Sequence, residues 1–510
     1  MFILLNPSSE DTRKNTYPLG LAYIAAAMEK HGKTTVLDLH YDNDLCYVLY
    51  SSIMSKKYKF LGITLCSVHV YESFKIARLV KRLTPEIIIG IGGSHATFMG
   101  KEILEQCREI DVCFIGAGEH AASKVAENLA AGKPWMENVK NVIYRNEDKV
   151  IQTDFDEYDK DFIKRPARHL LPSILEYAHK LEDTPTLSID TSRGCPGKCA
   201  FCTFSLSRRR RWICRRIEDV INDIKCSIDE NNLDKMDVYF TDADFLASTS
   251  RATKLIKAMR DIPQVDKYII AARPDSIIKS KSLLDELFKS GCANVEIGIE
   301  TSAESQLRRY GKGTTPEINN EAVEILNQYK SKYTFSISVD LIPFDPFVTW
   351  NELYETNVFL QKYFYGDVQN EFAFIHEMML APGSKYRENV ITTELSDAGS
   401  PISLPFWQFK HKECANIYAA LLYYRNTLIK YKTNIRAKLL NSYAECSLSK
   451  KEKIKLYRSH RYIDTVTYDF INTMLQNKAK DNIVDVIDKI KDKLQEINVN
   501  LDYIRLKYGG

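Results

Sequence analysis

The chain has 510 residues, of which 45% are hydrophobic and 27% are charged, and its formal net charge is +3. Because domains of about 100–200 residues are the norm, we expect two or three of them. The mild positive charge does not predict nucleic-acid binding, since such proteins carry a strong, clustered basic excess. No run approaches the roughly 20 consecutive apolar residues of a membrane-spanning helix, so no membrane span is predicted.

The N-terminus and the cysteine content together favour a cytoplasmic protein. The opening MFILLNPSS has a short apolar stretch without a preceding basic region or a following cleavage site, so it predicts a buried strand rather than a secretory signal. Twelve cysteines are too few for a disulfide scaffold in a chain of this length. In a reducing compartment, closely spaced cysteines more often bind metal, which singles out Cys195, Cys199 and Cys202.

The first third of the chain alternates short apolar runs with amphipathic segments, as in a parallel sheet covered by helices. The predicted strands are residues 2–5, 35–38, 60–64, 87–91 and 112–115. Helices are predicted over residues 19–30 and 72–83, with Gly32 and Pro85 marking their ends. The pattern predicts an α/β fold class with a doubly wound, flavodoxin-like domain over residues 1–135.

Three glycine-containing turns stand where a ligand of such a sheet would bind, beyond the carboxyl ends of its strands. Glycine lets the backbone approach a large ligand, and N–H groups at helix starts can bind its polar groups. For His95 the alternative is a turn residue with a local hydrogen bond. The candidate ligand-contacting residues are Pro18, Leu19, Gly20, Gly92, Gly93, Ser94, His95, Gly116, Gly118 and Glu119.

These turns, which read Pro-Leu-Gly-Leu-Ala-Tyr, Gly-Gly-Ser-His-Ala-Thr and Gly-Ala-Gly-Glu, resemble the cobalamin-binding domain fused to many radical S-adenosylmethionine enzymes. The resemblance implies that they contact cobalamin. Methionine-synthase-like domains have an Asp-x-His-x-x-Gly motif after the first strand, whereas this chain has Asn6-Pro7-Ser8-Ser9 there. Asp38-Leu39-His40 follows the second strand and lacks the glycine. We therefore expect no histidine ligand to cobalt from that motif.

Cys195, Cys199 and Cys202 are spaced C-x-x-x-C-x-x-C after a predicted strand. Three thiolates on one loop can hold a four-iron cluster and leave one iron open. A structural zinc site is the alternative, but zinc sites more often pair two C-x-x-C knuckles, and neither Cys214 nor Cys226 repeats the spacing. The motif closely resembles that of the radical S-adenosylmethionine family, in which the open iron binds the cofactor's amino and carboxylate groups and delivers the electron that cleaves its sulfonium.

Strands and helices continue to alternate after the cysteines, which predicts a partial (βα)6 barrel over residues 181–399. Its predicted strands are residues 186–190, 238–240, 268–272, 295–299, 335–341 and 372–375. The resemblance implies that Asp242 or Asp244 contacts the ammonium group of S-adenosylmethionine, and that Arg273 and Glu300 line its pocket. Structural ion pairs at the barrel rim are the alternative for Arg273 and Glu300.

The remaining segments carry no predicted catalytic residue. Residues 136–180 are assigned to a linker with a hairpin around Asn146, and the basic run at 208–216 is assigned to packing near the cluster rather than to nucleic acid. Residues 400–510 predict a mainly helical domain, with helices near 421–431 and 483–497. By analogy, this domain closes the barrel mouth and selects the substrate.

The resemblance implies a cobalamin-dependent radical enzyme with a 4Fe-4S cluster and S-adenosylmethionine. A 5′-deoxyadenosyl radical would abstract hydrogen from an unactivated carbon of a small molecule or peptide, and methylcobalamin would supply a methyl group, so a C-methyltransferase is expected. Ring closure, ring contraction or rearrangement with the same cofactors is the first alternative. A redox sensor or scaffold is the alternative from another class.

The resemblance also implies a flavodoxin- or ferredoxin-type electron donor. RNA-modifying methylthiotransferases share the barrel but carry three further cluster cysteines near the N-terminus. Here Cys46, Cys66, Cys107 and Cys113 are scattered over different predicted elements, which disfavours that activity.

Overall fold

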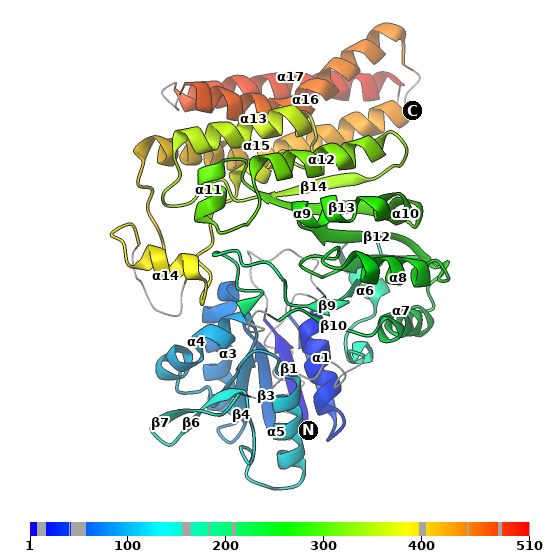
Figure 1. Cartoon of the computed structure of the whole chain (residues 1–510). Helices are drawn as coiled ribbons and strands as arrows, with labels where there is room; N and C mark the ends of the chain where they lie inside the picture. Colours follow the sequence, from blue (N-terminus) through cyan, green and yellow to red (C-terminus); the bar gives the residue numbers. More distant parts are fainter. Residues whose placement is uncertain are drawn as a thin grey trace. The chain divides into compact units, whose positions relative to one another are not determined.

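The structure is a computed structural model that describes residues 1–7, 17–39, 41, 58–155, 165–181, 184–206, 211–396, 404–445, 448–477 and 482–508 (Figure 1). The sequence features at Ser8, Ser9, His40, Cys46 and residues 208–210 lie outside this range. The chain forms two compact units. Unit 1 comprises Met1–Glu296, Gln328–Ile337 and Met379–Phe406, and unit 2 comprises Ile297–Asn327, Ser338–Met378 and Trp407–Gly510. Within the described ranges, no helix is long and apolar enough to cross a membrane.

The N-terminal part of unit 1 is built on a seven-stranded sheet with the order β2-β1-β3-β4-β5-β6-β7. Its strands are β1 (Phe2–Asn6), β2 (Thr34–Asp38), β3 (Phe60–Thr64), β4 (Ile88–Gly92), β5 (Val112–Phe114), β6 (Val142–Asn146) and β7 (Lys149–Gln152). The first five run parallel, and β1 and β3 are neighbours although β2 lies between them in sequence. The predicted doubly wound α/β domain is confirmed.

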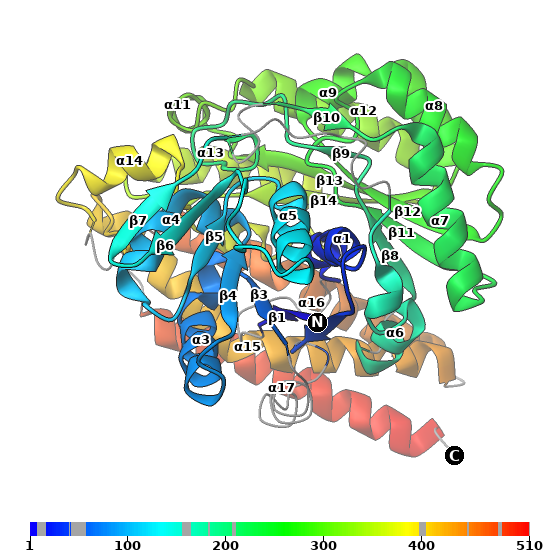
Figure 2. The same ribbon diagram turned by 90° about the horizontal axis from the view of Figure 1, so that it is seen from below.

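Helices cover both faces of this sheet, and alternate residues of each strand point to opposite faces. On one face, Ile3 and Leu5 pack in a core with α3 (Val70–Leu83) and α4 (Ser94–Gln106). On the other face, Phe2 and Leu4 pack in a core with α1 (Leu19–Met28) and α5 (Glu119–Ala130). Figure 2 shows α1 and α5 side by side on their face, away from α3 and α4. The carboxyl edge of the sheet lies between these two layers.

The hairpin expected in the linker exists, but it belongs to the sheet. Strand β6 pairs antiparallel with β5, with Val112 opposite Tyr144 and Phe114 opposite Val142. Without this pairing, β5 would leave a row of backbone N–H and C=O groups unpaired at the sheet edge. The sheet therefore extends to Gln152, beyond the boundary at residue 135 that the sequence suggested.

The second sheet has five strands in the order β14-β13-β12-β11-β8. They are β8 (Thr186–Ile189), β11 (Met236–Phe240), β12 (Val265–Ala272), β13 (Cys292–Glu300) and β14 (Ser336–Leu341). Its connecting helices are α7 (Ile217–Asn231), α8 (Thr249–Met259), α9 (Pro274–Lys279), α10 (Leu284–Lys289), α11 (Glu304–Arg309) and α12 (Pro316–Lys330). Where pairing is resolved, β11 runs parallel to both β8 and β12, as the barrel prediction requires.

The sixth predicted barrel strand, at residues 372–375, is wrong. The chain there forms a 3-10 helix, Ala373–Ile375, whose three residues are all buried. A short, fully apolar run does not distinguish a buried strand from a buried helical turn. The only parallel pairing described nearby is an isolated bridge between Phe344 and Glu377, just beyond the predicted segment.

The C-terminal part of unit 2 is helical, as expected. Its long helices are α13 (Trp350–Phe364), α15 (Lys412–Glu445), α16 (Lys450–Gln476) and α17 (Ile483–Tyr508). Helix α15 contacts both α16 and α17, and α13 contacts α16. Buried apolar side chains at helical spacing, such as Leu421, Tyr424 and Leu428, form the seam, where Tyr424 stacks on Phe470 with ring centroids 4.4 Å apart.

Candidate functional site

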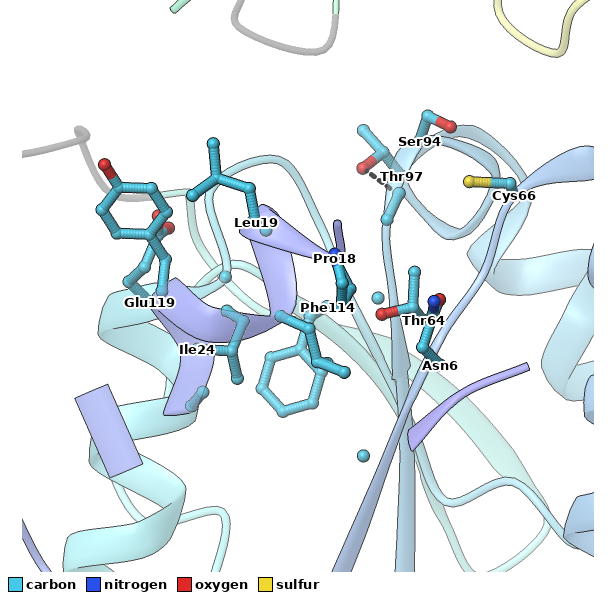
Figure 3. A pocket seen from close by; sticks show the side chains of 18 of the residues that line it. Asn6, Pro18, Leu19, Ile24, Thr64, Cys66, Ser94, Thr97, Phe114 and Glu119 are labelled. Atoms are coloured by element: carbon cyan, nitrogen blue, oxygen red, sulfur yellow. Dashed lines mark hydrogen bonds between the residues drawn. The ribbon is translucent and has the colours of Figure 1, made fainter. Parts of the chain in front are cut away.

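A cavity of about 750 Å³ lies at the carboxyl edge of the seven-stranded sheet, within unit 1 (Figure 3). Strand ends, helix starts and the turns between them form its wall. All of the predicted turn residues except His95 line it, namely Pro18, Leu19, Gly20, Gly92, Gly93, Ser94, Gly116, Gly118 and Glu119. The structure thus brings together three turns, at residues 18–20, 92–94 and 116–119, at the place that parallel sheets use for ligands.

Two glycines inside strands also shape the cavity. A Cβ atom on Gly62 would lie 2.6 Å from Cδ2 of Leu4, and one on Gly90 would lie 2.7 Å from ring atoms of both Phe60 and Phe114. Any side chain at these positions would displace the residues that form the floor. The strand glycines therefore let these side chains pack closely over the sheet as the cavity floor, and the volume and mainly apolar lining of the cavity fit a large cofactor such as cobalamin.

His95 does not line the cavity. It is 1% exposed and lies in the first turn of α4, and its Nδ1 is 2.9 Å from the hydroxyl of Ser67, 28 positions away. The candidate residues named from the sequence did not include Asn6, Thr64 or Thr97, which line the cavity. Their signal was available, because Asn6 and Thr64 end two neighbouring parallel strands.

Thr97 connects two of the three turns. Its hydroxyl donates a 2.8 Å hydrogen bond to the carbonyl oxygen of Gly93 and accepts a 3.1 Å bond from the N–H of Gly116. Gly93 has a φ of +122°, and a Cβ there would lie 2.6 Å from the carbonyl oxygen of Leu65. The turn after β4 is therefore restricted to glycine and held in place by a threonine.

A second wall of the same cavity comes from the segment that contains the cysteines. Asp190, Ser192, Arg193 and Gly194 precede Cys195, Thr203 and Phe204 follow Cys202, and all six line the cavity together with Thr241. Arg193 donates to Asp190 over 2.7 Å and also to Glu119 at the start of α5. This pair of bonds ties the cysteine segment to the turns of the N-terminal domain.

The three cysteines lie on one loop between β9 (Ser192–Arg193) and β10 (Ile213–Cys214), and each is partly exposed. Gly194 before them has a φ of +86°, and a Cβ there would lie 2.0 Å from the carbonyl oxygen of Arg211, so the loop needs glycine. Across the described part of the chain, no three His, Cys, Asp or Glu side chains lie close enough to hold one metal ion. A four-iron cluster places its thiolates on separate irons, so this loop remains compatible with it.

Asp242 holds the start of the cysteine loop. Its buried carboxylate accepts hydrogen bonds from the N–H and the hydroxyl of Thr191, both over 2.8 Å, and from the hydroxyl of Ser192. Burial outweighs these donors and raises the pKa of Asp242 to about 6. Asp242 therefore positions the start of the loop at Thr191 and Ser192, and Ser192 lies three residues before Cys195.

Asp244 and Arg273 lie together beside the cysteine loop. Asp244 accepts a 2.7 Å bond from the hydroxyl of Ser276 and a 3.4 Å bond from the N–H of Arg273, and burial raises its pKa. The Arg273 side chain bonds Asp275 and approaches Cys199. Glu300 belongs to unit 2, where Lys312 donates to it over 2.7 Å in a buried pair. Of the four residues predicted for S-adenosylmethionine, three thus gather in unit 1 beside the cysteine loop.

Comparison with known proteins agrees with the two cofactors that the sequence predicts. Two protein-family models match the chain, the B12 binding domain over residues 11–126 and the radical SAM superfamily over residues 189–360. An uncharacterised methyltransferase of Pyrococcus horikoshii is 25% identical over 341 residues, which cover 64% of this chain and 71% of the relative. An anaerobic magnesium-protoporphyrin IX monomethyl ester cyclase of Cereibacter sphaeroides is 24% identical over 339 residues, which cover 61% of this chain and 51% of that relative.

Among solved structures, the cobalamin-dependent S-adenosylmethionine radical enzyme OxsB, with aqua-cobalamin and S-adenosylmethionine bound, superposes with a TM-score of 0.76 at 17% identity. The superposition covers 99% of this chain and 79% of OxsB, and it establishes a shared fold. A doubly wound ligand-binding domain followed by a barrel with a three-cysteine loop defines a class of radical enzymes that use two large cofactors. This chain belongs to the cobalamin-dependent radical S-adenosylmethionine enzymes.

Proposed function

We propose that this enzyme is a C-methyltransferase that acts on an unactivated carbon of a small molecule or peptide. One observation carries the proposal: the glycine turns of the B12-binding domain and the residues that flank the cysteine loop line a single cavity. Methyl transfer to a carbon radical requires the methyl donor and the radical source to lie within reach of one substrate atom. The likeness to a protein named as a methyltransferase supports this reaction.

Each cofactor has a proposed set of residues. Cys195, Cys199 and Cys202 would hold the cluster, and Asp244 and Arg273, with Asp242 and Glu300, would contribute to the S-adenosylmethionine pocket. The turns of the cavity, with Asn6, Thr64 and Thr97 added, would hold cobalamin. When bound, these cofactors supply radical formation and the methyl group.

The chain itself positions these groups and excludes water. Asp242 and Trp212 both bond Ser192, which fixes the segment before the cysteines, and the ion pair of Arg193 with Glu119 fixes this segment against α5. Phe114 and Phe204 contribute apolar surface to the cavity from its two walls. An apolar lining limits side reactions of a reactive intermediate with water. A flavodoxin- or ferredoxin-type donor and a cytoplasmic location belong to the same proposal.

Ring closure with the same cofactors is the second candidate, favoured by the likeness to a cyclase. The two reactions differ in what happens to S-adenosylmethionine. A methyltransferase of this kind uses one molecule as the radical source and another to renew the methyl group on cobalamin, whereas a cyclase needs only the first.

The test is anaerobic reconstitution of the full chain with iron, sulfide and hydroxocobalamin, followed by incubation with S-adenosylmethionine and a strong reductant. We expect 5′-deoxyadenosine from the wild type and none from Cys199→Ala. The matched control is Cys226→Ala, because this cysteine lies on α7, outside the loop, and should leave 5′-deoxyadenosine formation intact. Bound cobalamin should be equal in all three proteins, since both substitutions leave the glycine turns unchanged.

The products separate the candidate functions. S-Adenosylhomocysteine together with methylcobalamin supports the methyltransferase, whereas 5′-deoxyadenosine without either product supports ring closure. Bound zinc without 5′-deoxyadenosine under any reducing condition would overturn both. A cluster and cobalamin that bind without any cleavage of S-adenosylmethionine would instead indicate a sensor or scaffold.

A further inference from the structure

Arg273 is held rigidly at the carboxyl end of β12. Its backbone N–H donates to the carboxylate of Asp244 over 3.4 Å, and its Nε donates to the carboxylate of Asp275 over 3.0 Å. The side chain is 11% exposed, so most of the guanidinium is removed from water. Backbone and side chain are thus anchored separately, which leaves the guanidinium little freedom to turn.

The anchored guanidinium points its Nη1 at the cysteine loop. Nη1 lies 3.5 Å from the sulfur of Cys199, within hydrogen-bonding range for a sulfur acceptor. The loop makes room for this approach at Gly197, where a Cβ atom would lie 3.0 Å from the same Nη1 and 3.3 Å from the sulfur of Cys195. The contact therefore involves complementary features on both sides, a fixed arginine and a glycine in the loop.

We propose that Arg273 is a positioning residue that raises the reduction potential of the cluster by donating a charge-assisted hydrogen bond to the Cys199 thiolate. The inference rests on the cluster of the proposed function and adds a residue that controls its redox behaviour. Reduction adds one negative charge to a cluster, and the potentials of such clusters depend on net charge, on hydrogen bonds to sulfur and on solvent exposure.

The charge of Arg273 is permanent under all conditions of the reaction. A guanidinium is not deprotonated in proteins. A fixed cation next to the thiolate stabilises the reduced cluster more than the oxidised one, because the interaction grows with the negative charge of the cluster. A lysine would keep the charge but lose the planar arrangement of donors that bonds sulfur and carboxylate together.

The test is a redox titration of the reconstituted full chain, followed by the electron paramagnetic resonance signal of the reduced cluster, without S-adenosylmethionine. We expect Arg273→Gln to lower the midpoint potential and change the g values at unchanged iron and sulfide content. Arg273→Lys should give a midpoint between those of Arg273→Gln and the wild type. The matched control is Arg251→Gln, which also removes an arginine beside the loop but one that donates to the carbonyl oxygen of Thr191. Its midpoint should stay close to that of the wild type.

Each outcome decides between the inference and the proposed function. If Arg273→Gln and Arg273→Lys both assemble the cluster with the midpoint and g values of the wild type, the inference fails and the proposed function stands. If Arg251→Gln shifts the midpoint potential as much as Arg273→Gln does, the shift comes from the loss of any nearby positive charge. The contact between Arg273 and Cys199 is then not its cause, and the inference is wrong. If the wild type assembles no iron–sulfur cluster, the proposed function fails and the inference falls with it. If only Arg273→Gln fails to assemble, the midpoint of Arg273→Lys decides: a lowered value supports the inference, and an unchanged one overturns it.

Discussion

The hydroxyl of Tyr23, on α1, donates a 2.5 Å hydrogen bond to the carboxylate of Asp190, which directly follows β8. The two residues are 167 positions apart in sequence, and both are buried. The guanidinium of Arg193, which also bonds Asp190, lies 4.2 Å from the centre of the Tyr23 ring. The first helix of the B12-binding domain is thereby joined to the first strand of the radical SAM domain at the wall of the cofactor cavity.

Replacing this tyrosine tests how strongly the two domains are joined. Tyr23→Phe removes a buried hydrogen bond to a charged acceptor, which contributes about 1.5–3 kcal/mol. We expect faster amide hydrogen exchange in α1 and β8, measured by mass spectrometry on the full chain. Tyr58→Phe is the control, because it removes a neutral bond to Thr35 in the same domain and should have a smaller effect. Equal effects of the two substitutions would show that the bond to Asp190 has no special weight.

The raised pKa of Asp242 predicts a pH dependence of stability. Because burial raises this pKa from 3.8 to about 6, the folded protein retains a proton that the unfolded chain loses between these pH values. The stability contributed by Asp242 is therefore present below pH 4 and is lost as the pH rises to 6, by at most about 1.4 kcal/mol per pH unit. We expect Asp242→Asn to gain stability relative to the wild type across this window and to show a constant difference above it.

The measurement is chemical denaturation of the wild type and of Asp242→Asn at a series of pH values, with the unfolding of unit 1 followed by hydrogen exchange. Other acidic groups titrate in both proteins, so only the difference between the two curves reports on Asp242. Parallel curves between pH 4 and 6 would contradict the raised pKa.

The strand glycines predict that a side chain added at the cavity floor lowers the stability of the fold. Gly90→Ala would place a methyl group 2.7 Å from the rings of Phe60 and Phe114, and overpacking of this kind costs about 1–3 kcal/mol. We expect a lower melting temperature and less bound cobalamin after reconstitution. Gly20→Ala is the stability control, because nothing lies within 4 Å of a Cβ at this helical position. It should leave the melting temperature unchanged or raise it slightly. A Gly90→Ala protein with normal stability and full cobalamin content would refute this account of the cavity.

A buried ion pair in unit 2 predicts that the effects of two substitutions on stability do not add. Lys432 on α15 is 2% exposed and bonds Glu371 and, over 2.9 Å, the hydroxyl of Thr467 on α16. Lys432→Met leaves the Glu371 charge buried without its cation, which costs about 3–5 kcal/mol. The double substitution Lys432→Met with Glu371→Met removes both charges and should be less destabilising than Lys432→Met alone. Thermal unfolding and limited proteolysis of α15 and α16 measure both effects.

The matched control for this pair is Lys438→Met on the same helix. Lys438 bonds Asp502 over 3.1 Å, but both side chains are partly exposed to water, so its loss should cost less than about 1 kcal/mol. If Lys432→Met is no worse than Lys438→Met, the ion pair does not stabilise the helical part of unit 2.

The sequence alone was sufficient to predict those features that depend only on residues close together in the chain. Parallel strands that are buried on both faces appear as continuous apolar runs, so β3 was predicted to the residue and β4 to within one residue. The spacing of Cys195, Cys199 and Cys202 needs no distant partner to define a loop. Most of the cavity turns could be predicted for the same reason, because a glycine turn after a parallel strand is a local pattern with one expected position in the sheet.

Only the tertiary structure decided which distant groups meet. The hairpin of β6 and β7 was visible in the sequence, but its pairing with β5 is a long-range contact. The apolar run at Ala373–Ile375 is compatible with strand or helix until its neighbours are known. The bond between the carboxylate of Asp242 and Thr191, 51 positions away, likewise has no local signal. A polar side chain forms hydrogen bonds with the groups that the fold brings within about 3 Å. Once it is buried, losing such a bond costs free energy, because water cannot replace the partner. No local pattern of residues in the sequence identifies that partner.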